Sequence, residues 1–232
     1  MPKAPIQKMF DSIADRYDFL NHTLSLFRDV AWRKHSVRLL KNRAPKDCKL
    51  LDLCGGTGDF SKTYSKELGV PQLSVVGDFS YAMLSKVNAK SKELISVQLD
   101  ATKTPFIDQS FDVILNAFGM RNLLDTAQGL EEVQRLLKPK GYFLTLEFFS
   151  PIDVFSRFFY KILAPLFIPF LGSIFSKKKE AYEYLVRSVL QFLSVKEYQD
   201  LAERLNFQCV SIKKMDMGIA YAVLLQKLEV KS

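Results

Sequence analysis

The chain contains few of the residues that build metal centres and disulfide frameworks. Among its 232 residues are two histidines, His22 and His35, and three cysteines, Cys48, Cys54 and Cys209. None of them has the spacing of a metal-binding motif, and an odd number of widely separated cysteines implies no disulfide framework. We therefore expect no bound metal and a reducing, cytoplasmic location.

We also expect neither a secretory signal nor a membrane-spanning helix. The start of the chain, MPKAPIQKMFDSIADRYD, has no apolar core of the kind that a signal peptide needs. The longest apolar stretch, residues 154–175, is interrupted by Arg157 and Lys161 and then by Pro165, Pro169 and Gly172. Charges and broken helices both disfavour a span. We expect an apolar flap that packs on the protein or enters a membrane surface.

The charge is positive but moderate, with a formal net charge of +8 and 48% hydrophobic residues. A basic surface suits an anionic partner, either a membrane or a nucleic acid. No motif that alternates aromatic and basic residues for RNA binding is present, so we do not expect a nucleic-acid partner. A soluble basic enzyme without such a partner explains the charge equally well.

The order of the expected elements predicts an α/β protein. Residues 6–42 have apolar positions at helical spacing. Short apolar runs follow this region. They predict strands at 49–53, 72–78, 94–100, 111–118, 142–149, 207–216 and 219–228. Helices are expected between them at 59–68, 80–91, 126–141 and 194–205. Alternating strands and helices are typical of a mostly parallel sheet covered on both faces. We expect one domain, residues 1–232, with a helical cap (1–46), a core (47–150), the apolar flap (151–190) and a closing helix with two strands (191–232).

The stretch LLDLCGGTGDFS, residues 50–61, joins the first expected strand to a helix through a glycine loop. It matches neither the phosphate-loop pattern GxxxxGK[ST] nor the dinucleotide pattern GxGxxG. Asp52 and Asp59 flank the loop, and two carboxylates disfavour a phosphate there. They suit a cationic or zwitterionic ligand such as S-adenosylmethionine, which carries an ammonium, a sulfonium and no phosphate.

Acidic residues also follow the next two expected strands. Asp78 ends the second strand, where a carboxylate can accept both hydroxyls of a ribose. Asp100 and Ala101 end the third, where they can meet the polar edge of an adenine. Open α/β sheets bind ligands at these carboxyl ends. The alternative is that these aspartates and glycines are ordinary turn residues.

These motifs make the chain resemble the class I S-adenosylmethionine-dependent methyltransferases, with their Rossmann-like fold. Within that class it resembles the UbiE/MenG/COQ5 family of quinone-ring C-methyltransferases. The matching stretches are MFDSIADRYDFLNHTLS, WRK, LDLCGGTGDF, GDFSYAML, LDATKTPFIDQSFDVI, FGMRNLLD, RLLKPKGYFLTLEF and AYEYL. The resemblance implies that S-adenosylmethionine is the co-substrate. The expected cofactor-binding residues are Asp52, Gly55, Gly56, Thr57, Gly58, Asp78, Phe79, Asp100, Ala101 and Asn116.

The resemblance further implies an acceptor that is a reduced polyprenyl quinone precursor, foremost a demethylmenaquinol. Arg121 is expected to stabilise the phenolate-like oxygen, Asn122 to orient the hydroxyl, and Tyr17 to close over the pocket and assist proton transfer. The structural alternatives are an ion pair for Arg121 and helix packing for Tyr17. Alternative functions are methylation of a ubiquinone-pathway benzoquinol, methylation of another lipid or small molecule, and a non-catalytic binding module. Self-association into a homo-oligomer is compatible with the sequence.

The chain departs from the family pattern at three places. Phe27 stands where the family has a glycine, Lys140 replaces the first glycine of LKPGG, and Val223 stands where a histidine is common. A polyprenyl tail would give the aromatic flap a purpose, either as a tunnel or at a bilayer interface. The flap residues considered are Phe155, Arg157, Phe158, Phe159, Lys161, Phe167, Phe170, Phe175, Lys177, Lys178 and Lys179. Ordinary core packing is the alternative.

Overall fold

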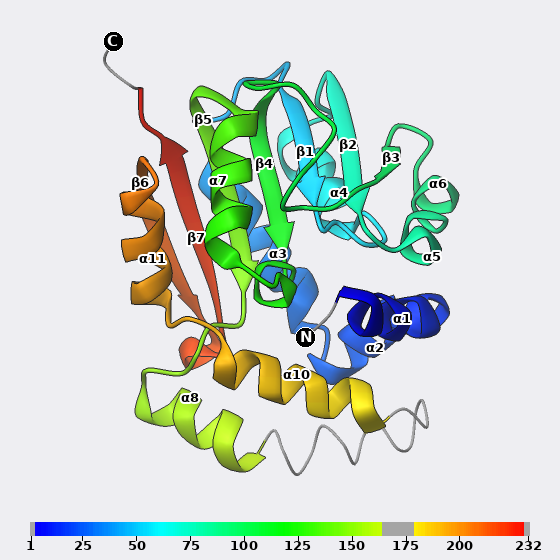
Figure 1. Cartoon of the computed structure of the whole chain (residues 1–232), viewed down its shortest axis with the longest axis vertical. Helices are drawn as coiled ribbons and strands as arrows, with labels where there is room; N and C mark the ends of the chain where they lie inside the picture. The colour runs from blue at the N-terminus through cyan, green and yellow to red at the C-terminus, as the bar shows by residue number, and fades with distance from the viewer. Residues whose placement is uncertain (1–2, 164–178, 230–232) are drawn as a thin grey trace.

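A seven-stranded sheet forms the centre of the computed structural model, which describes residues 3–163 and 179–229 (Figure 1). The strands are β1 (Lys49–Leu53), β2 (Leu73–Asp78), β3 (Ile95–Gln98), β4 (Phe111–Ala117), β5 (Leu137–Glu147), β6 (Phe207–Met215) and β7 (Ala220–Lys227). They lie in the order β3-β2-β1-β4-β5-β7-β6. Only β7 pairs antiparallel, between β5 and β6. The predicted mostly parallel sheet of seven strands is confirmed.

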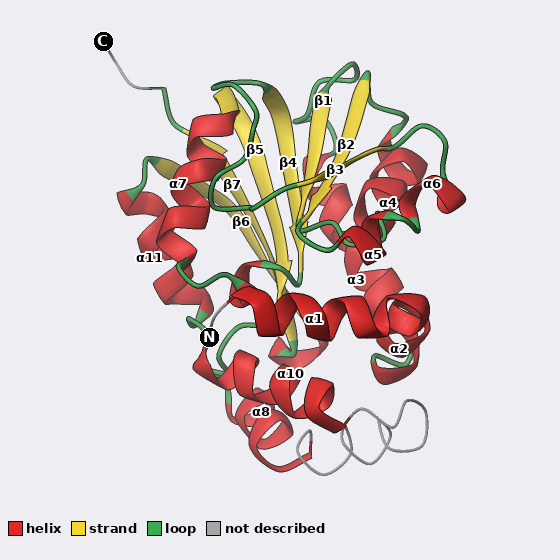
Figure 2. Ribbon diagram, turned by 45° about the vertical axis from the view of Figure 1, so that its right-hand side comes forward, coloured by secondary structure: helices red, strands yellow, loops and turns green. Residues whose placement is uncertain are grey.

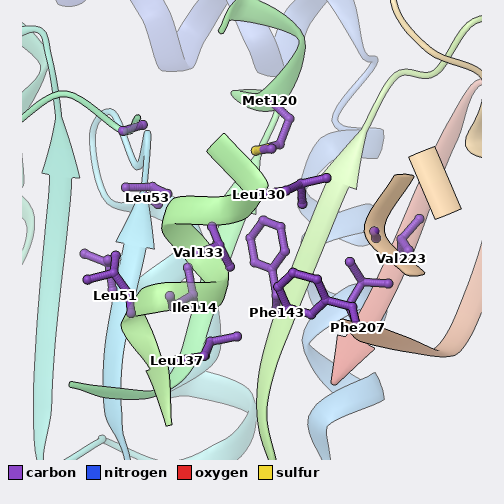
Figure 3. Packing of buried hydrophobic residues seen from close by; sticks show 14 of the residues in the cluster. Leu51, Leu53, Ile114, Met120, Leu130, Val133, Leu137, Phe143, Phe207 and Val223 are labelled. Carbon is purple, nitrogen blue, oxygen red and sulfur yellow. The ribbon is translucent and has the colours of Figure 1, made fainter. Parts of the chain in front are cut away.

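Helices cover both faces of the sheet because the strand side chains alternate between two apolar clusters. Leu51 and Leu53 of β1 belong to the cluster that α7 (Thr126–Leu136) and α11 (Val195–Arg204) cover. Leu50 belongs to the cluster on the opposite face, under α3 (Arg28–Val37) and α4 (Asp59–Leu68). Figure 3 shows the first cluster, in which Leu130 and Val133 of α7 pack near strand residues that include Ile114 and Phe143.

The predicted N-terminal helical cap is present as several short helices. They are α1 (Lys3–Ile13), a 3₁₀ turn (Ala14–Arg16), α2 (Tyr17–Leu24), α3 and a second 3₁₀ turn (Arg38–Leu40). Leu26 and Phe27 break the helical run, with left-handed φ angles of 51° and 62°. α1 and α2 lie across the edge of the sheet at which the parallel strands end (Figures 1 and 2). This is the edge where open α/β sheets bind their ligands.

Part of the expected flap is described, as α8 (Val154–Phe158), a π-helical turn (Phe159–Leu163) and α10 (Lys179–Gln191). Figure 2 shows α8 and α10 beyond the same ends of the strands as α1. Residues 164–178, with Phe167, Phe170, Phe175, Lys177 and Lys178, lie outside the described residues. Within the described ranges, no helix has the length and hydropathy that crossing a membrane requires.

Two predicted helices differ in extent from the observed ones. The helix expected over 126–141 ends at Leu136, and β5 begins at Leu137. Lys138 precedes Pro139, which disfavours a helical conformation at Lys138, while Leu137 pairs with Phe111 of β4. The helix expected over 80–91 is split into α5 (Tyr81–Leu84) and α6 (Val87–Lys90).

Candidate active site

The glycine loop at the end of β1 makes a tight turn before α4. The amide of Gly55 donates to the Gly77 carbonyl at 3.1 Å. A Cβ on Gly55 would lie 2.7 Å from Val76 Cγ1 and 2.8 Å from the Asp52 carbonyl oxygen, so only glycine fits this close approach. Gly58 has a φ of 80° and precedes α4, which begins at residue 59 as predicted. The loop backbone is therefore fixed against β2.

Asp78 ends β2, as predicted, and is 5% exposed. Its Oδ2 accepts the Gly56 amide at 3.0 Å, and its Oδ1 accepts the Ser80 amide at 2.8 Å. Burial raises the pKa of Asp78 to about 6, although these amides oppose the shift. The carboxylate thus joins the loops after β1 and β2 at one wall of a cavity that it helps to line.

This first cavity has a volume of about 410 Å³, within the range of ligand pockets. It brings together Gly56, Asp78, Phe79, Asp100 and Ala101 from the predicted cofactor set. The described residues that line it include two carboxylates and neither lysine nor arginine. This lining suits the cationic, phosphate-free S-adenosylmethionine that the loop predicts.

The other predicted cofactor residues do not line this cavity. Asp52 is fully buried beneath the loop, where its Oδ2 accepts the Ser61 amide of α4 at 2.9 Å. Its Oδ1 has no hydrogen-bond partner among the described residues. Burial raises the pKa of Asp52 to about 7. Asn116 is also fully buried and donates to the Leu53 carbonyl at 2.7 Å. Both residues support the loops from behind.

Thr57, Gly55 and Gly58 likewise stand outside the cavity lining. Thr57 is 3% exposed, and its hydroxyl donates to Asp18 Oδ1 of α2 at 2.7 Å. Cys54 does line the cavity, and burial raises the pKa of its thiol well above the usual value. A thiol that stays protonated is a poor nucleophile, so we interpret Cys54 as a packing residue.

The N-terminal helices cover the first cavity through polar contacts at helical spacing. Gln7 donates to the Phe79 carbonyl at 3.0 Å, and the Ser80 hydroxyl donates to Asp11 at 2.5 Å. Lys86 Nζ lies 2.5 Å from Asp15 Oδ1. Together with Asp18, these side chains bind the cap to the loops after β1 and β2. Asp11, Asp15 and Asp18 are thus the acidic residues of the cap that contact these segments.

A second cavity of about 290 Å³ adjoins the first. Phe10, Tyr17 and Phe118 line both cavities, so they form a shared wall. The Tyr17 ring lies 3.9 Å from where a Cβ on Gly56 would stand, and desolvation raises the pKa of its hydroxyl. The rest of the second cavity is mostly apolar and comes from the N-terminal helices, the start of the flap and α10. Two adjacent ligands can therefore meet across Tyr17.

Arg121 lines the second cavity and also makes the ion pair that the sequence left as an alternative. Its Nη1 lies 2.6 Å from Glu147 Oε1 and donates to the Phe118 carbonyl at 2.7 Å. The guanidinium lies over the rings of Phe118 and Phe148, with centroid distances of 5.9 and 5.5 Å. Burial raises the pKa of Glu147, and the positive charge of Arg121 opposes this rise. A cation held in a fixed position therefore lies in the wall of the second cavity.

Asn122 lines the first cavity, next to Arg121 in the 3₁₀ turn Met120–Asn122. Its Nδ2 donates to the Phe118 carbonyl at 3.0 Å, and its Oδ1 accepts the hydroxyl of Tyr184 at 2.9 Å. Tyr184 belongs to α10 and lines the second cavity. The predicted catalytic residues Arg121, Asn122 and Tyr17 therefore meet at the boundary between the cavities.

Sequence reasoning missed several residues of the second cavity. Tyr184 lies in the AYEYL stretch, which carried the resemblance without a role. Asp29 lines the cavity and is 2% exposed; its Oδ2 pairs with Arg33 at 2.5 Å and with His22 Nδ1 at 2.8 Å. The helical spacing of Asp29 and Arg33 was available as a signal. Asp216 joins the cavity from beyond β6, where no local pattern predicts it.

Solved structures that share this architecture include methyltransferases. A methyltransferase from a complex with the Haloferax volcanii Trm112 activator has a TM-score of 0.70 at 15% identity, over 95% of this chain and 98% of its own. A Thermotoga maritima S-adenosylmethionine-dependent methyltransferase has a TM-score of 0.63 at 18% identity, over 96% of this chain and 99% of its own. The fold is therefore that of the class I S-adenosylmethionine-dependent methyltransferases.

Sequence relatives identify the family to which the chain belongs within this class. The model of the ubiE/COQ5 methyltransferase family matches residues 2–226. A demethylmenaquinone methyltransferase of Staphylococcus carnosus is 35% identical, over 94% of this chain and 91% of its own. The protein of that name from Thermotoga maritima is 36% identical, over 94% of each chain. A ubiquinone/menaquinone biosynthesis C-methyltransferase of Geotalea daltonii is 38% identical, over 93% of each. The chain belongs to the ubiE/COQ5 methyltransferase family.

Proposed function

We propose that this enzyme transfers the methyl group of S-adenosylmethionine to a ring carbon of a demethylmenaquinol. The observation that carries the proposal is the shared wall of Tyr17 and Phe118 between a carboxylate-lined cavity and an apolar cavity that holds Arg121. The first suits the cationic methyl donor, and the second suits an aromatic ring with an apolar tail. The names of the relatives support this choice of acceptor.

The donor cavity assigns roles to the residues that line it. Asp78 accepts the ribose hydroxyls, as its place at the end of β2 suggests. Asp100 and Ala101 meet the adenine edge, and Phe79 packs beside it. Gly56 leaves room for the ligand near the Tyr17 ring. Asp52, Asn116 and Thr57 hold these groups in place without lining the cavity. When bound, S-adenosylmethionine supplies an electrophilic methyl group.

The acceptor must present an electron-rich carbon to that methyl. Loss of a hydroxyl proton from the quinol raises electron density at the neighbouring ring carbon. The carbon–carbon bond forms as the carbon–sulfur bond breaks, and the electrons of the latter stay on sulfur. The ring proton then leaves and the hydroxyl is restored, so one proton is released per transfer.

Arg121 stabilises the phenolate-like oxygen because its fixed positive charge faces the place where negative charge develops. It is not the base, because an arginine side chain does not lose its proton in proteins. Glu147 and the Phe118 carbonyl hold the guanidinium in position. Asn122, fixed by Tyr184, orients the hydroxyl, and Tyr17 closes the junction against water. Alignment of donor and acceptor supplies the remainder of the rate enhancement.

A benzoquinol of the ubiquinone pathway is the second candidate acceptor. The name of the Geotalea daltonii relative, at 38% identity, covers both quinone types. Either acceptor carries a polyprenyl tail, so we infer that the enzyme works from the cytoplasmic side at a membrane surface. Self-association remains a prediction.

The test is transfer of a labelled methyl from S-adenosylmethionine to chemically reduced demethylmenaquinol, with the demethyl benzoquinol assayed in parallel in detergent. Label in the naphthoquinol is the expected result, and the ratio between the acceptors identifies the pathway. Cofactor binding without label in either acceptor would refute the proposed substrate. A sample with the oxidised quinone is the control, because only the quinol has a hydroxyl to deprotonate.

A further inference from the structure

Three segments that border the acceptor cavity expose large apolar side chains. In the turn between α2 and α3, Leu26 is 79% exposed and Phe27 is 66% exposed. Met217, in the turn between β6 and β7, is 61% exposed. On α8 the exposed fractions are 86% for Val154 and 52% for Phe158. Isolated exposed apolar residues are common, but groups of them mark interaction surfaces.

The Asp216–Gly218 turn connects the three segments. Arg28, which follows Phe27, pairs with Asp216 with an Nε–Oδ2 distance of 2.8 Å. On the other side of the turn, Lys214 Nζ lies 2.7 Å from Oδ2 of Asp153, the residue before α8. Tyr160 ties the end of the same helical segment to the turn by donating to the Ile219 carbonyl at 2.7 Å.

All three segments also contribute to the lining of the acceptor cavity, through Leu26, Asp216 and Phe159. Leu26 lines the cavity while most of its surface faces solvent, so it stands at the rim. A ligand tail that leaves the cavity there passes between exposed apolar side chains.

The backbone of the two turns is held in a conformation that side chains disfavour. Leu26, Phe27 and Met217 have φ angles of 51°, 62° and 56°. In this region glycine is free of strain, whereas other residues lose free energy. Phe27 recovers part of the cost by stacking on His22 at a centroid distance of 5.6 Å. Exposed apolar residues on such turns are explained by an apolar partner that accepts them.

Cations accompany the apolar side chains. Arg157 and Lys161 are exposed on the α8 segment beside Val154 and Phe158, and Lys213 is exposed on β6 near the turn. Among the described residues, no ion pair joins these three to an acid. Apolar side chains flanked by such cations are the pattern of protein segments that lie in the headgroup region of an anionic membrane. The positive net charge of the chain acts in the same direction.

We propose that Leu26, Phe27, Met217 and the exposed face of α8 form one surface that docks on a lipid bilayer with anionic headgroups. Docking there sets the rim of the acceptor cavity against the bilayer, so that a polyprenyl tail stays in lipid while its ring enters the cavity. The tail passage rests on the proposed function, whereas the docking itself does not. The occupant is the bilayer, not a second copy of the chain.

The test is co-sedimentation of the full chain with vesicles of phosphatidylcholine alone or mixed with phosphatidylglycerol. The variant is Phe27→Gly with Met217→Gly, because glycine accepts both backbone conformations. Neither residue lines either of the two cavities described above. The control is Ile107→Ser. The Ile107 side chain is 80% exposed and precedes β4, which begins at Phe111. A further variant, Arg157→Gln with Lys161→Gln, tests the charges.

We expect the unaltered chain and the Ile107 control to bind the phosphatidylglycerol vesicles. The glycine variant should bind at least about tenfold more weakly, since burial of one large apolar side chain exceeds the free energy of a tenfold change. The glutamine variant should lose the preference for anionic vesicles. Absence of binding by the unaltered chain, or unchanged binding by the glycine variant, would overturn the proposal.

Two further measurements separate this proposal from its alternatives. Light scattering measures whether the unaltered chain forms a dimer. If it does, and the glycine variant is a monomer, the surface binds a second copy of the chain and the proposal is wrong. Turnover of a naphthoquinol without a prenyl tail should be equal in the unaltered chain and the glycine variant, whereas turnover of a prenylated acceptor in vesicles should fall in the variant. Absence of turnover on both acceptors would refute the proposed function and leave the vesicle result standing.

Discussion

The hydroxyl of Thr57 donates a hydrogen bond of 2.7 Å to the carboxylate of Asp18, and this contact joins the glycine loop to the helical cap. The loop belongs to the donor cavity, and the cap supplies Tyr17 to the wall shared with the acceptor cavity. This contact therefore links the loop beside one cavity to the helix that carries Tyr17 between the two cavities.

Replacement of Thr57 by valine should weaken cofactor binding about tenfold or more, since a hydrogen bond to a charged group contributes about 1.5–3 kcal/mol. Titration calorimetry with S-adenosylmethionine measures the change. Thr63→Val is the matched control, because the Thr63 hydroxyl bonds only to the Asp59 carbonyl within α4. Equal affinities for the two variants would contradict the role of the contact.

Replacement of Arg121 by methionine should lower turnover about 10²–10³-fold, because it removes a charge that stabilises the developing oxyanion. Cofactor affinity should stay the same, since Arg121 does not line the donor cavity. The substitution also strands Glu147, which is fully buried, and such losses cost about 3–5 kcal/mol of stability.

The double variant Arg121→Met with Glu147→Gln separates the two effects. It should recover most of the stability in urea unfolding but none of the turnover, because the neutral amide needs no cation. Recovery of turnover together with stability would assign Arg121 to the structural ion pair alone.

Replacement of Tyr184 by phenylalanine should lower turnover about fivefold. This is the factor that corresponds to the loss of one neutral hydrogen bond of about 1 kcal/mol. The hydroxyl holds Asn122 Oδ1 at 2.9 Å, so its loss leaves Asn122 less well oriented. The KM for S-adenosylmethionine should not change. Tyr142→Phe on β5, a residue outside both cavities, is the control. A change confined to the KM for the cofactor would count against this positioning role.

Asp52 should make a contribution to the stability of the protein that falls as pH rises. Burial raises its pKa from 3.8 to about 7, so the folded state holds the proton more tightly than the unfolded state. The contribution is favourable at low pH and is lost as pH rises from the unfolded value through the folded one. At about 1.4 kcal/mol per pKa unit, the loss amounts to a few kcal/mol.

Asp52→Asn should remove this slope, because its amide does not titrate and its oxygen can still accept the Ser61 amide. Urea unfolding at a series of pH values between 4 and 8 measures both proteins. Parallel curves for the variant and the unaltered chain would locate the pH dependence elsewhere.

Local patterns in the sequence were sufficient to predict seven strands and several of their ends. β1 and α4 begin and end as predicted because an apolar run, a glycine loop and a helix follow each other without interruption. Asp78, Asp100 and Ala101 could be assigned because the ends of successive parallel strands meet at one edge of the sheet. By contrast, the end of α7 was placed too late, since the pairing of Leu137 with β4 competes with the helix there.

The acceptor side was decided by tertiary structure. Asp216, Tyr184 and Leu26 come from distant parts of the chain and share one cavity, and no spacing along the sequence encodes such a meeting. Tertiary packing also separated Gly56 and Asp78, which line the donor cavity, from Asp52 and Asn116, which lie buried behind it. The sequence alone determines which chemical groups are available at the ends of the strands, because local patterns show where each strand ends along the chain. Which of those groups face a ligand depends on helices that arrive from far away in the chain and bury the others.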